Sequence, residues 1–326
     1  MKLKKILLLS RDPGIIRIFK AFHNEVHTVT VIKNVSSACK FLDKYPDSID
    51  LVFIHLNNSK EDYSPLIQMI NKKAISFINP YIVVVDNRKD NSALKMGADI
   101  VCHRFPDEKD IDLIIHDDRS SLNLNAIINH AASMIRIKDT QTAEHCRNTA
   151  KISSALASLY MQYFEGMSLL WHQNLKTAAL LHDIGKILIP ESVLRKSSRL
   201  TDDEFRIMKS HTKLGGELFK NMMNTYQGFE LLSLCTEVCF YHHERFDGTG
   251  YPEGLKGDRI PLEARIVAIA DVFDALTSDR YYRNARTFDE ALQIMRYEEE
   301  GHFDPKLFDL FMNNSDIFIQ IKSQMK

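Results

Sequence analysis

Three short runs of apolar residues stand out in the first third of the chain, each followed by polar or turn-forming residues. They cover residues 6–9, 51–54 and 81–85. Continuous apolar runs of this length are typical of strands that are buried on both faces. Between them, residues 15–22 and 36–42 carry apolar side chains at helical spacing. Strands that alternate with helices predict an α/β domain, in which helices cover both faces of a parallel sheet.

The pattern changes after the polar segment 117–121, which we take as a domain boundary. From there to about residue 310 almost every segment has helical periodicity, beginning with a predicted connecting helix over residues 122–138. The sequence therefore predicts two domains, an α/β domain of residues 1–118 and an all-α helical bundle of residues 119–326. Further helices of the bundle are predicted over residues 150–160, 175–181, 203–219, 231–241, 262–277 and 288–298.

The composition narrows the class of protein. Lysine and arginine number 42, and aspartate and glutamate 43, so the net charge is only −1. This balance excludes the basic field that nucleic-acid binding needs and the acidic excess of a disordered chain. The apolar run after Lys4 and Lys5 stops at Ser10, too early for a signal peptide, and no segment approaches the roughly 18 apolar residues of a membrane span. Five cysteines without a CxxC pair favour a reducing compartment. We expect a cytoplasmic protein that neither binds DNA nor inserts into a membrane.

The order of elements in the first domain, with the turn Gly-Ala-Asp at residues 97–99, resembles a response-regulator receiver domain, which has a flavodoxin-like fold. At the position of the phosphate-accepting aspartate the chain has His55. The acidic pair that holds Mg²⁺ is replaced by Arg11-Asp12, and the lysine of the family by Arg104. Without two carboxylates there is no hard oxygen cage for Mg²⁺. We predict a degenerate receiver that is not phosphorylated and that docks a signalling protein partner or a second copy; for His55, a structural role at a strand end is the simpler interpretation.

The chemistry is expected in the second domain, where acidic residues directly follow apolar runs. His182-Asp183 follows the run 178–181, and Asp271 follows the run 266–270. Such runs place these side chains in the protein interior, where a carboxylate without a partner is costly. Coordination to a metal ion removes that cost. The pattern therefore indicates a metal site.

Two segments make this expectation specific. The segments His-Asp-Ile-Gly-Lys at 182–186 and His-His-Glu-Arg-Phe-Asp-Gly-Thr-Gly-Tyr-Pro at 242–252 resemble the HD-GYP subgroup of the HD phosphohydrolase superfamily. Residues 187–190, 265–280 and 301–305 agree with it, so the resemblance runs from about residue 139 to about residue 310. It implies an all-helical bundle that binds two or three metal ions and hydrolyses cyclic di-GMP, a bacterial signalling molecule.

The resemblance also implies a set of metal ligands. Seven ligands are too many for one tetrahedral zinc ion, but they fit two six-coordinate ions if Asp183 and a hydroxide bridge them and two positions are left for phosphate oxygens. Five imidazoles and two carboxylates favour iron, with manganese as the alternative, over magnesium. Carried over one position at a time, the ligands are His145, His182, Asp183, His211, His242, His243 and Asp271.

The expected reaction is hydrolysis of cyclic di-GMP to linear pGpG, with GMP as a further product. Two ions ~3.5–4 Å apart would clamp the scissile phosphate and generate the bridging hydroxide. Lys186 would stabilise or protonate the leaving oxygen, the alternative being a cation at a helix end. The resemblance assigns Arg280 and Arg283 to the second phosphate, which suits their planar donors. The loop with Gly250, Tyr251 and Pro252 would shape the substrate pocket, the alternative being an ordinary turn.

Two departures from the family pattern border this pocket. Gln141, four residues before His145, is a poor metal ligand, so we predict two ions rather than three. The usual Lys-Pro-Gly segment reads Lys-Ser-Ser at 196–198. Two alternatives to the main function stay open: a hydrolase for another cyclic dinucleotide, and a non-catalytic, metal-binding signalling scaffold.

Overall fold

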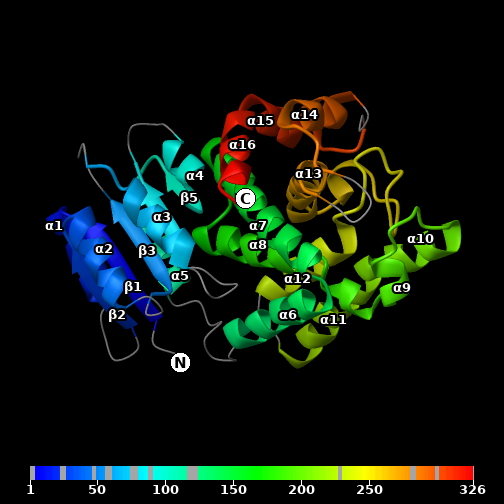
Figure 1. Cartoon of the computed structure of the whole chain (residues 1–326). Helices are drawn as coiled ribbons and strands as arrows, with labels where there is room; N and C mark the ends of the chain where they lie inside the picture. Colours follow the sequence, from blue (N-terminus) through cyan, green and yellow to red (C-terminus); the bar gives the residue numbers. More distant parts are fainter. Residues whose placement is uncertain are drawn as a thin grey trace. The chain divides into compact units, whose positions relative to one another are not determined.

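A computed structural model of the chain (Figure 1) forms two compact units. The first comprises Met1–Asn129 with Met161–Leu170, and the second comprises His130–Tyr160 with Trp171–Lys326. The boundary predicted after residue 118 falls in the segment 116–123, outside the described residues. The structure describes residues 4–22, 27–45, 49–55, 61–73, 80–86, 91–115, 124–226, 230–279, 284–297 and 301–325.

The first unit is built on a five-stranded parallel sheet in the order β2-β1-β3-β4-β5, the strand order of flavodoxin-like folds. The predicted α/β class is therefore confirmed. Two strands had not been predicted: β2 alternates threonine with valine and has no continuous apolar run, and β5 has only three residues. The strands are β1 Lys4–Ser10, β2 His27–Ile32, β3 Leu51–His55, β4 Tyr81–Val85 and β5 Ile100–Cys102.

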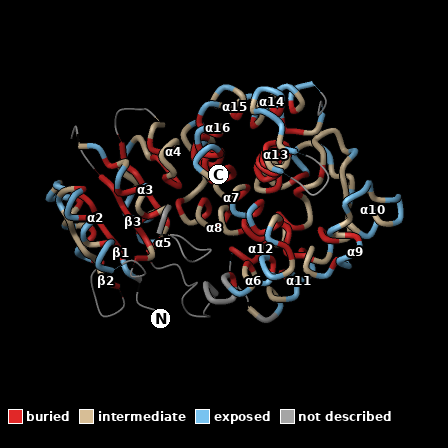
Figure 2. Tube along the Cα trace, in the orientation of Figure 1, coloured by how far each residue is buried: buried red, intermediate tan, exposed pale blue. Residues whose placement is uncertain are grey.

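Helices bury both faces of this sheet (Figure 2). Phe19 of α1 and Ile111 of α5 share a core with Phe53 of β3. Leu8 of β1 belongs to the same core. Because side chains alternate along a strand, Leu7 and Leu9 point to the other face of the sheet, and they are fully buried as well. The helices of residues 4–115 are α1 Pro13–Ala21, α2 Val35–Lys44, α3 Ser64–Lys73, α4 Ser92–Met96 and α5 Glu108–Ile115.

The second part of the chain is helical throughout its described residues, apart from loops and two short 3₁₀ turns, η2 Ile184–Leu188 and η3 Gly257–Arg259. This confirms the predicted helical class. No helix within the described ranges is both long and apolar enough to cross a membrane. The helices are α6 Leu124–Lys138, α7 Thr140–Tyr163, α8 Leu169–Leu181, α9 Glu191–Leu194, α10 Asp202–Lys209, α11 His211–Thr225, α12 Glu230–Tyr241, α13 Leu262–Thr277, α14 Phe288–Tyr297, α15 Pro305–Asn313 and α16 Ser315–Ser323.

The prediction of one helix over residues 203–219 is wrong, and the difference matters for the site. The chain forms two helices, and the break at Ser210 leaves His211 as the first residue of α11. The hydroxyl of Ser210 donates to the carbonyl of Ile207 at 2.6 Å, which satisfies an acceptor at the end of α10. Periodicity alone does not detect this break, because apolar residues continue at helical spacing across it.

Candidate metal centre

The seven side chains predicted as metal ligands lie together in the helical unit. His145 extends from α7 and Asp271 from α13, while His211 begins α11. The pair His182-Asp183 directly follows α8, and His242-His243 directly follows α12. The possible ligand atoms of His145, His182 and Asp271 lie within 4.8 Å of one another, and so do those of the triplet His211, His242 and His243.

Asp183 lies between these two groups of side chains. Its Oδ1 atom is 3.3 Å from Nε2 of His211, which belongs to the triplet of imidazoles. Its Oδ2 atom is 3.3 Å from Nε2 of His182, in the other group. The side chain is 1% exposed. A carboxylate in this position is suited to bridge two cations, one in each group.

The orientation of three imidazoles is set by carbonyl groups of the main chain. A carbonyl oxygen only accepts hydrogen bonds, so each Nδ1 atom that contacts one carries the proton. The Nε2 atom of each ring is then a bare lone pair directed at Asp183 or at its neighbours, which is the usual arrangement of a histidine that binds a metal. The Nδ1-to-carbonyl pairs are His182 with Ala179 at 2.8 Å, His211 with Met208 at 2.7 Å and His242 with Val238 at 2.9 Å.

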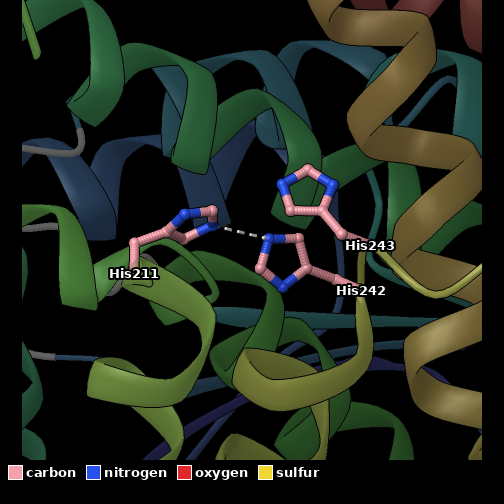
Figure 3. Close-up of side chains that lie close together, drawn as sticks. All are labelled: His211, His242 and His243. Atoms are coloured by element: carbon pink, nitrogen blue, oxygen red, sulfur yellow. Dashed lines mark hydrogen bonds between the residues drawn. The ribbon is translucent and has the colours of Figure 1, made fainter. Parts of the chain in front are cut away.

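Two of these lone pairs face each other. Figure 3 draws the line that joins Nε2 of His211 to Nε2 of His242, which are 3.3 Å apart. With both Nδ1 atoms protonated, neither Nε2 carries a proton to share, so the contact is repulsive unless a cation lies close to both. In addition, Nε2 of His182 and Oδ1 of Asp183 are buried and have no hydrogen-bond partner. Buried polar atoms without partners are costly, and the imidazole and carboxylate donors fit transition-metal ions.

The charge states also suit metal binding. Burial by itself raises the pKa of Asp183, but the nearby Lys186 ammonium lowers it well below its ordinary value. Burial likewise opposes ionisation of Asp271, and the hydrogen bond from His145 lowers its pKa well below the ordinary value. Burial lowers the pKa of His211 to about 4 and the pKa of His243 to about 3. At neutral pH the carboxylates are ionised and these imidazoles are neutral, as metal ligands must be.

A glycine brings η2 against the start of α11. A Cβ atom on Gly185 would lie 2.0 Å from the carbonyl oxygen of His211 and 2.8 Å from the main-chain nitrogen of Gly215. The two backbones therefore touch directly, which is possible only without a side chain. This contact keeps Asp183, two residues before Gly185, within reach of His211.

The Gly-Tyr-Pro loop is held beside the cluster. Glu244 is buried, and its carboxylate accepts hydrogen bonds from the main-chain N–H groups of residues 253–255 at 2.7, 3.1 and 3.0 Å. The ring of Tyr251 lies 4.9 Å from the ring of His243, centroid to centroid. A Cβ atom on Gly250 would lie 2.2 Å from the main-chain nitrogen of Arg245. The loop thus lies directly beside the imidazole of His243.

The other predicted site residues are placed differently. The Nζ atom of Lys186 donates to Oδ2 of Asp183 at 2.6 Å, so this lysine belongs to the cluster. Gln141 lies in the first turn of α7, one turn before His145. Arg280 and Arg283 lie outside the described residues.

Two residues near the site were missed by sequence reasoning. Asp274 is fully buried in α13, and its Oδ2 atom lies 2.7 Å from Nδ1 of His145. A second carboxylate one helical turn after Asp271, within the mainly apolar stretch 266–276, was a signal that could have identified it. Lys209 ends α10, and its Nζ atom lies 4.9 Å from the ring centroid of Tyr251. A lysine at the end of an exposed helix gives no such signal.

Comparison with known protein families agrees with this geometry. The family model described as HD domain matches residues 132–307, more than half of the chain. The chain belongs to the HD domain family. The matched segment contains the seven candidate ligands and the segments that resemble the HD-GYP subgroup.

Three named proteins are similar in sequence to this chain. The chain is 36% identical to a cyclic di-GMP phosphodiesterase of Vibrio cholerae over 60% of this chain and 40% of the relative. It is 45% identical to the cyclic di-GMP phosphodiesterase response regulator RpfG of Xanthomonas campestris over 46% of this chain and 38% of the relative. It is 34% identical to the 3'3'-cGAMP-specific phosphodiesterase 2 of Vibrio cholerae over 61% of this chain and 36% of the relative. The chain thus spans about two fifths of the length of these relatives.

The contact at Gly185 yields a first prediction. We expect Gly185→Ala to push η2 away from α11, to lower the free energy of unfolding by about 1–3 kcal/mol and to reduce the metal content of the protein. Denaturant unfolding and elemental analysis measure the two effects. Gly14→Ala in α1 is the matched control, because its Cβ atom meets only the end of the Asp12 side chain, at 3.2 Å. Wild-type metal content in Gly185→Ala would show that the contact does not position the site.

Removal of metal yields a second prediction. A chelator should lower the melting temperature, because it leaves ionised carboxylates and facing lone pairs buried without a cation. Restoring the free metal to about 100 times its Kd should raise the free energy of unfolding by about 2.7 kcal/mol. Calorimetry with and without chelator measures the difference. Asp183→Ala should lose this response, whereas Asp203→Asn, which changes an exposed carboxylate, should keep it. A wild-type protein that melts identically in both conditions contradicts the prediction.

Proposed function

We propose that this protein is a metal-dependent phosphodiesterase that hydrolyses cyclic di-GMP to linear pGpG and further to GMP. The observation that carries the proposal is the buried carboxylate of Asp183 between two groups of imidazoles whose bare Nε2 atoms face it. Relatives that share the HD domain are named cyclic di-GMP phosphodiesterases, which supports the substrate.

We infer that the cofactor is a pair of transition-metal ions, iron first and manganese second. His145, His182 and Asp271 would hold one ion, and the triplet His211, His242 and His243 the other. Asp183 would contact both. A donor set of five imidazoles and two carboxylates supports this preference, because magnesium and calcium favour oxygen ligands. The bound ions would supply Lewis acidity for the phosphate oxygens and would lower the pKa of water.

The residues of the chain would contribute orientation and a proton. The ammonium of Lys186 lies at the edge of the cluster, with a side chain that is 19% exposed, and it donates to Oδ2 of Asp183. We assign to Lys186 the stabilisation or protonation of the ribose 3′-oxygen as it leaves. Asp183 would serve as catalytic residue and ligand together, since its carboxylate faces both groups of imidazoles.

The substrate would be oriented by the loop and by two arginines. Gly250, Tyr251 and Pro252 border the cluster at His243, where the tyrosine ring offers a flat surface for a base or a ribose. By their positions in the family pattern, Arg280 and Arg283 are assigned to the phosphate that does not react. Guanidinium groups suit that role because they donate two parallel hydrogen bonds to phosphate oxygens.

The cyclic dinucleotide 3'3'-cGAMP is an alternative substrate. Relatives with comparable identity are named 3'3'-cGAMP-specific phosphodiesterases. Cyclic di-GMP and 3'3'-cGAMP carry the same two phosphates and differ in one purine, so the metal cluster alone does not distinguish them. Their comparison therefore belongs in the same experiment.

For residues 1–118 we propose a degenerate receiver-like domain that is not phosphorylated and that docks a signalling partner. Asp12 caps α1, where its Oδ1 atom accepts hydrogen bonds from the N–H groups of Gly14 and Ile15 at 2.8 and 3.2 Å. Arg11 forms an ion pair with Glu61 at 2.7 Å. His55 is buried at the end of β3, where burial lowers its pKa. These contacts support a structural use of positions at which a receiver binds Mg²⁺ and phosphate.

The enzymatic proposal predicts that anaerobically purified protein converts cyclic di-GMP to pGpG. Chromatography of the products and elemental analysis of the protein, with 3'3'-cGAMP in parallel, measure the reaction and the metal. Asp183→Ala should reduce the rate by more than the roughly 10- to 100-fold that loss of a partner of a ligand costs, because it removes a ligand. Asp203→Asn is expected to retain the wild-type rate, since its side chain is 81% exposed on α10.

The outcomes separate the candidate functions. Faster turnover of 3'3'-cGAMP than of cyclic di-GMP would change the substrate and keep the reaction class. Protein that holds two metal ions and hydrolyses neither dinucleotide would identify a metal-binding scaffold. Equal rates for the wild type and Asp183→Ala would exclude this cluster as the catalytic site.

The proposal for the receiver-like domain predicts that this domain is not phosphorylated. The full-length protein exposed to radiolabelled acetyl phosphate should retain no label, because the oxygen ligands of a Mg²⁺ site are missing or engaged in capping α1. Scintillation counting after gel filtration measures retention. Label that is retained by the wild type and lost in His55→Ala would contradict the proposal.

A further inference from the structure

A lysine is buried in the last helix of the chain. Lys322 lies near the end of α16, beyond residue 307, where the match to the HD domain model ends. Its side chain is 4% exposed, and Phe318 and Ile321 of the same helix are buried with it. Burial of an ammonium group is costly unless a partner compensates the charge. The position of Lys322 therefore depends on an anion inside the protein.

That anion is Asp274 of α13, which is fully buried. The Nζ atom of Lys322 donates to Oδ1 of Asp274 and, at 2.6 Å, to the hydroxyl of Ser278. The same hydroxyl donates to Oδ2 of Asp274 at 3.3 Å. The three side chains form a closed ring of hydrogen bonds, which fixes the plane of the carboxylate.

The carboxylate held in this ring contacts the metal cluster. Its Oδ2 atom lies 2.7 Å from Nδ1 of His145, and Nε2 of the same imidazole lies 2.8 Å from Oδ1 of Asp271. A carboxylate that accepts from Nδ1–H sets both the tautomer and the orientation of a histidine that binds a metal. If the Asp274 carboxylate could rotate, the His145 ring would lose that guide.

We propose that Lys322 is a positioning residue of the metal centre, which acts through Asp274 to hold the His145 imidazole with Nε2 directed at the ion. The inference rests on the proposed metal centre and extends it to a helix beyond the family match. The competing explanation is an ion pair that only neutralises a buried charge and anchors α16.

Metal binding by the full-length protein distinguishes the two explanations. The apo forms of the wild type, Lys322→Met, Lys322→Arg and the control Lys306→Met are titrated with Co²⁺, whose visible spectrum reports the geometry of its ligands. Lys306 is an exposed lysine of α15. We expect Lys322→Met to weaken Co²⁺ binding by about 10- to 100-fold and to alter the spectrum. Lys322→Arg should restore both properties, because it returns a cationic donor, and Lys306→Met should match the wild type. Unfolding of each apo form is measured alongside.

Wild-type Co²⁺ affinity and spectrum in Lys322→Met, with a lower free energy of unfolding, would overturn the proposal in favour of the ion pair. Should Lys322→Met not fold, Ser278→Ala provides the test, because it opens the ring and leaves the ion pair intact. Weaker Co²⁺ binding by Ser278→Ala supports the positioning role, and unchanged binding overturns it. A wild-type protein that takes up no Co²⁺ would instead overturn the metal centre, and this inference with it.

Discussion

The stability of the helical unit depends on how it compensates negative charge in its interior. Asp183 and Asp271 are ionised and almost fully removed from water, and three imidazoles of the cluster, those of His182, His211 and His242, turn a ring nitrogen without a proton inward. Positive charge in the same space offsets the cost of these carboxylates; Lys186 supplies one such charge, and the proposed metal ions would supply more. If the seven side chains bind metal ions as proposed, folding and cation binding would be coupled.

The ends of three helices orient imidazole side chains of the cluster. His182 follows α8, His211 follows α10, and His242 follows α12. In each case the Nδ1 atom donates to a carbonyl in the last turn of the preceding helix, where main-chain donors run short. One interaction thus completes the helix end and turns the opposite ring nitrogen inward. This explains why these three imidazoles stand at helix boundaries, and why the break at Ser210 matters for the orientation of His211.

The sequence predicted those parts that depend on pattern within a single segment. Continuous apolar runs identified β1, β3 and β4, and the motif segments identified seven side chains that the structure brings together. It did not predict β2, whose polar residues interrupt the apolar pattern, or the helix break before His211. The role of Asp274 also escaped, because it depends on contacts with residues far away in the chain, namely His145 and Lys322. Tertiary contacts of this kind leave almost no trace in local periodicity.

The position of α16 affects how shortened versions of this protein should be designed. A fragment cut at residues 132 and 307 would follow the family boundaries and contain every candidate ligand. It would also leave Asp274 as an interior anion without its ammonium, and it would uncover Phe273, whose ring centroid lies 5.3 Å from that of Phe311 in the full chain. Recombinant fragments intended for crystals or for assays should therefore extend through Ser323, even though the sequence signature of the domain ends well before it.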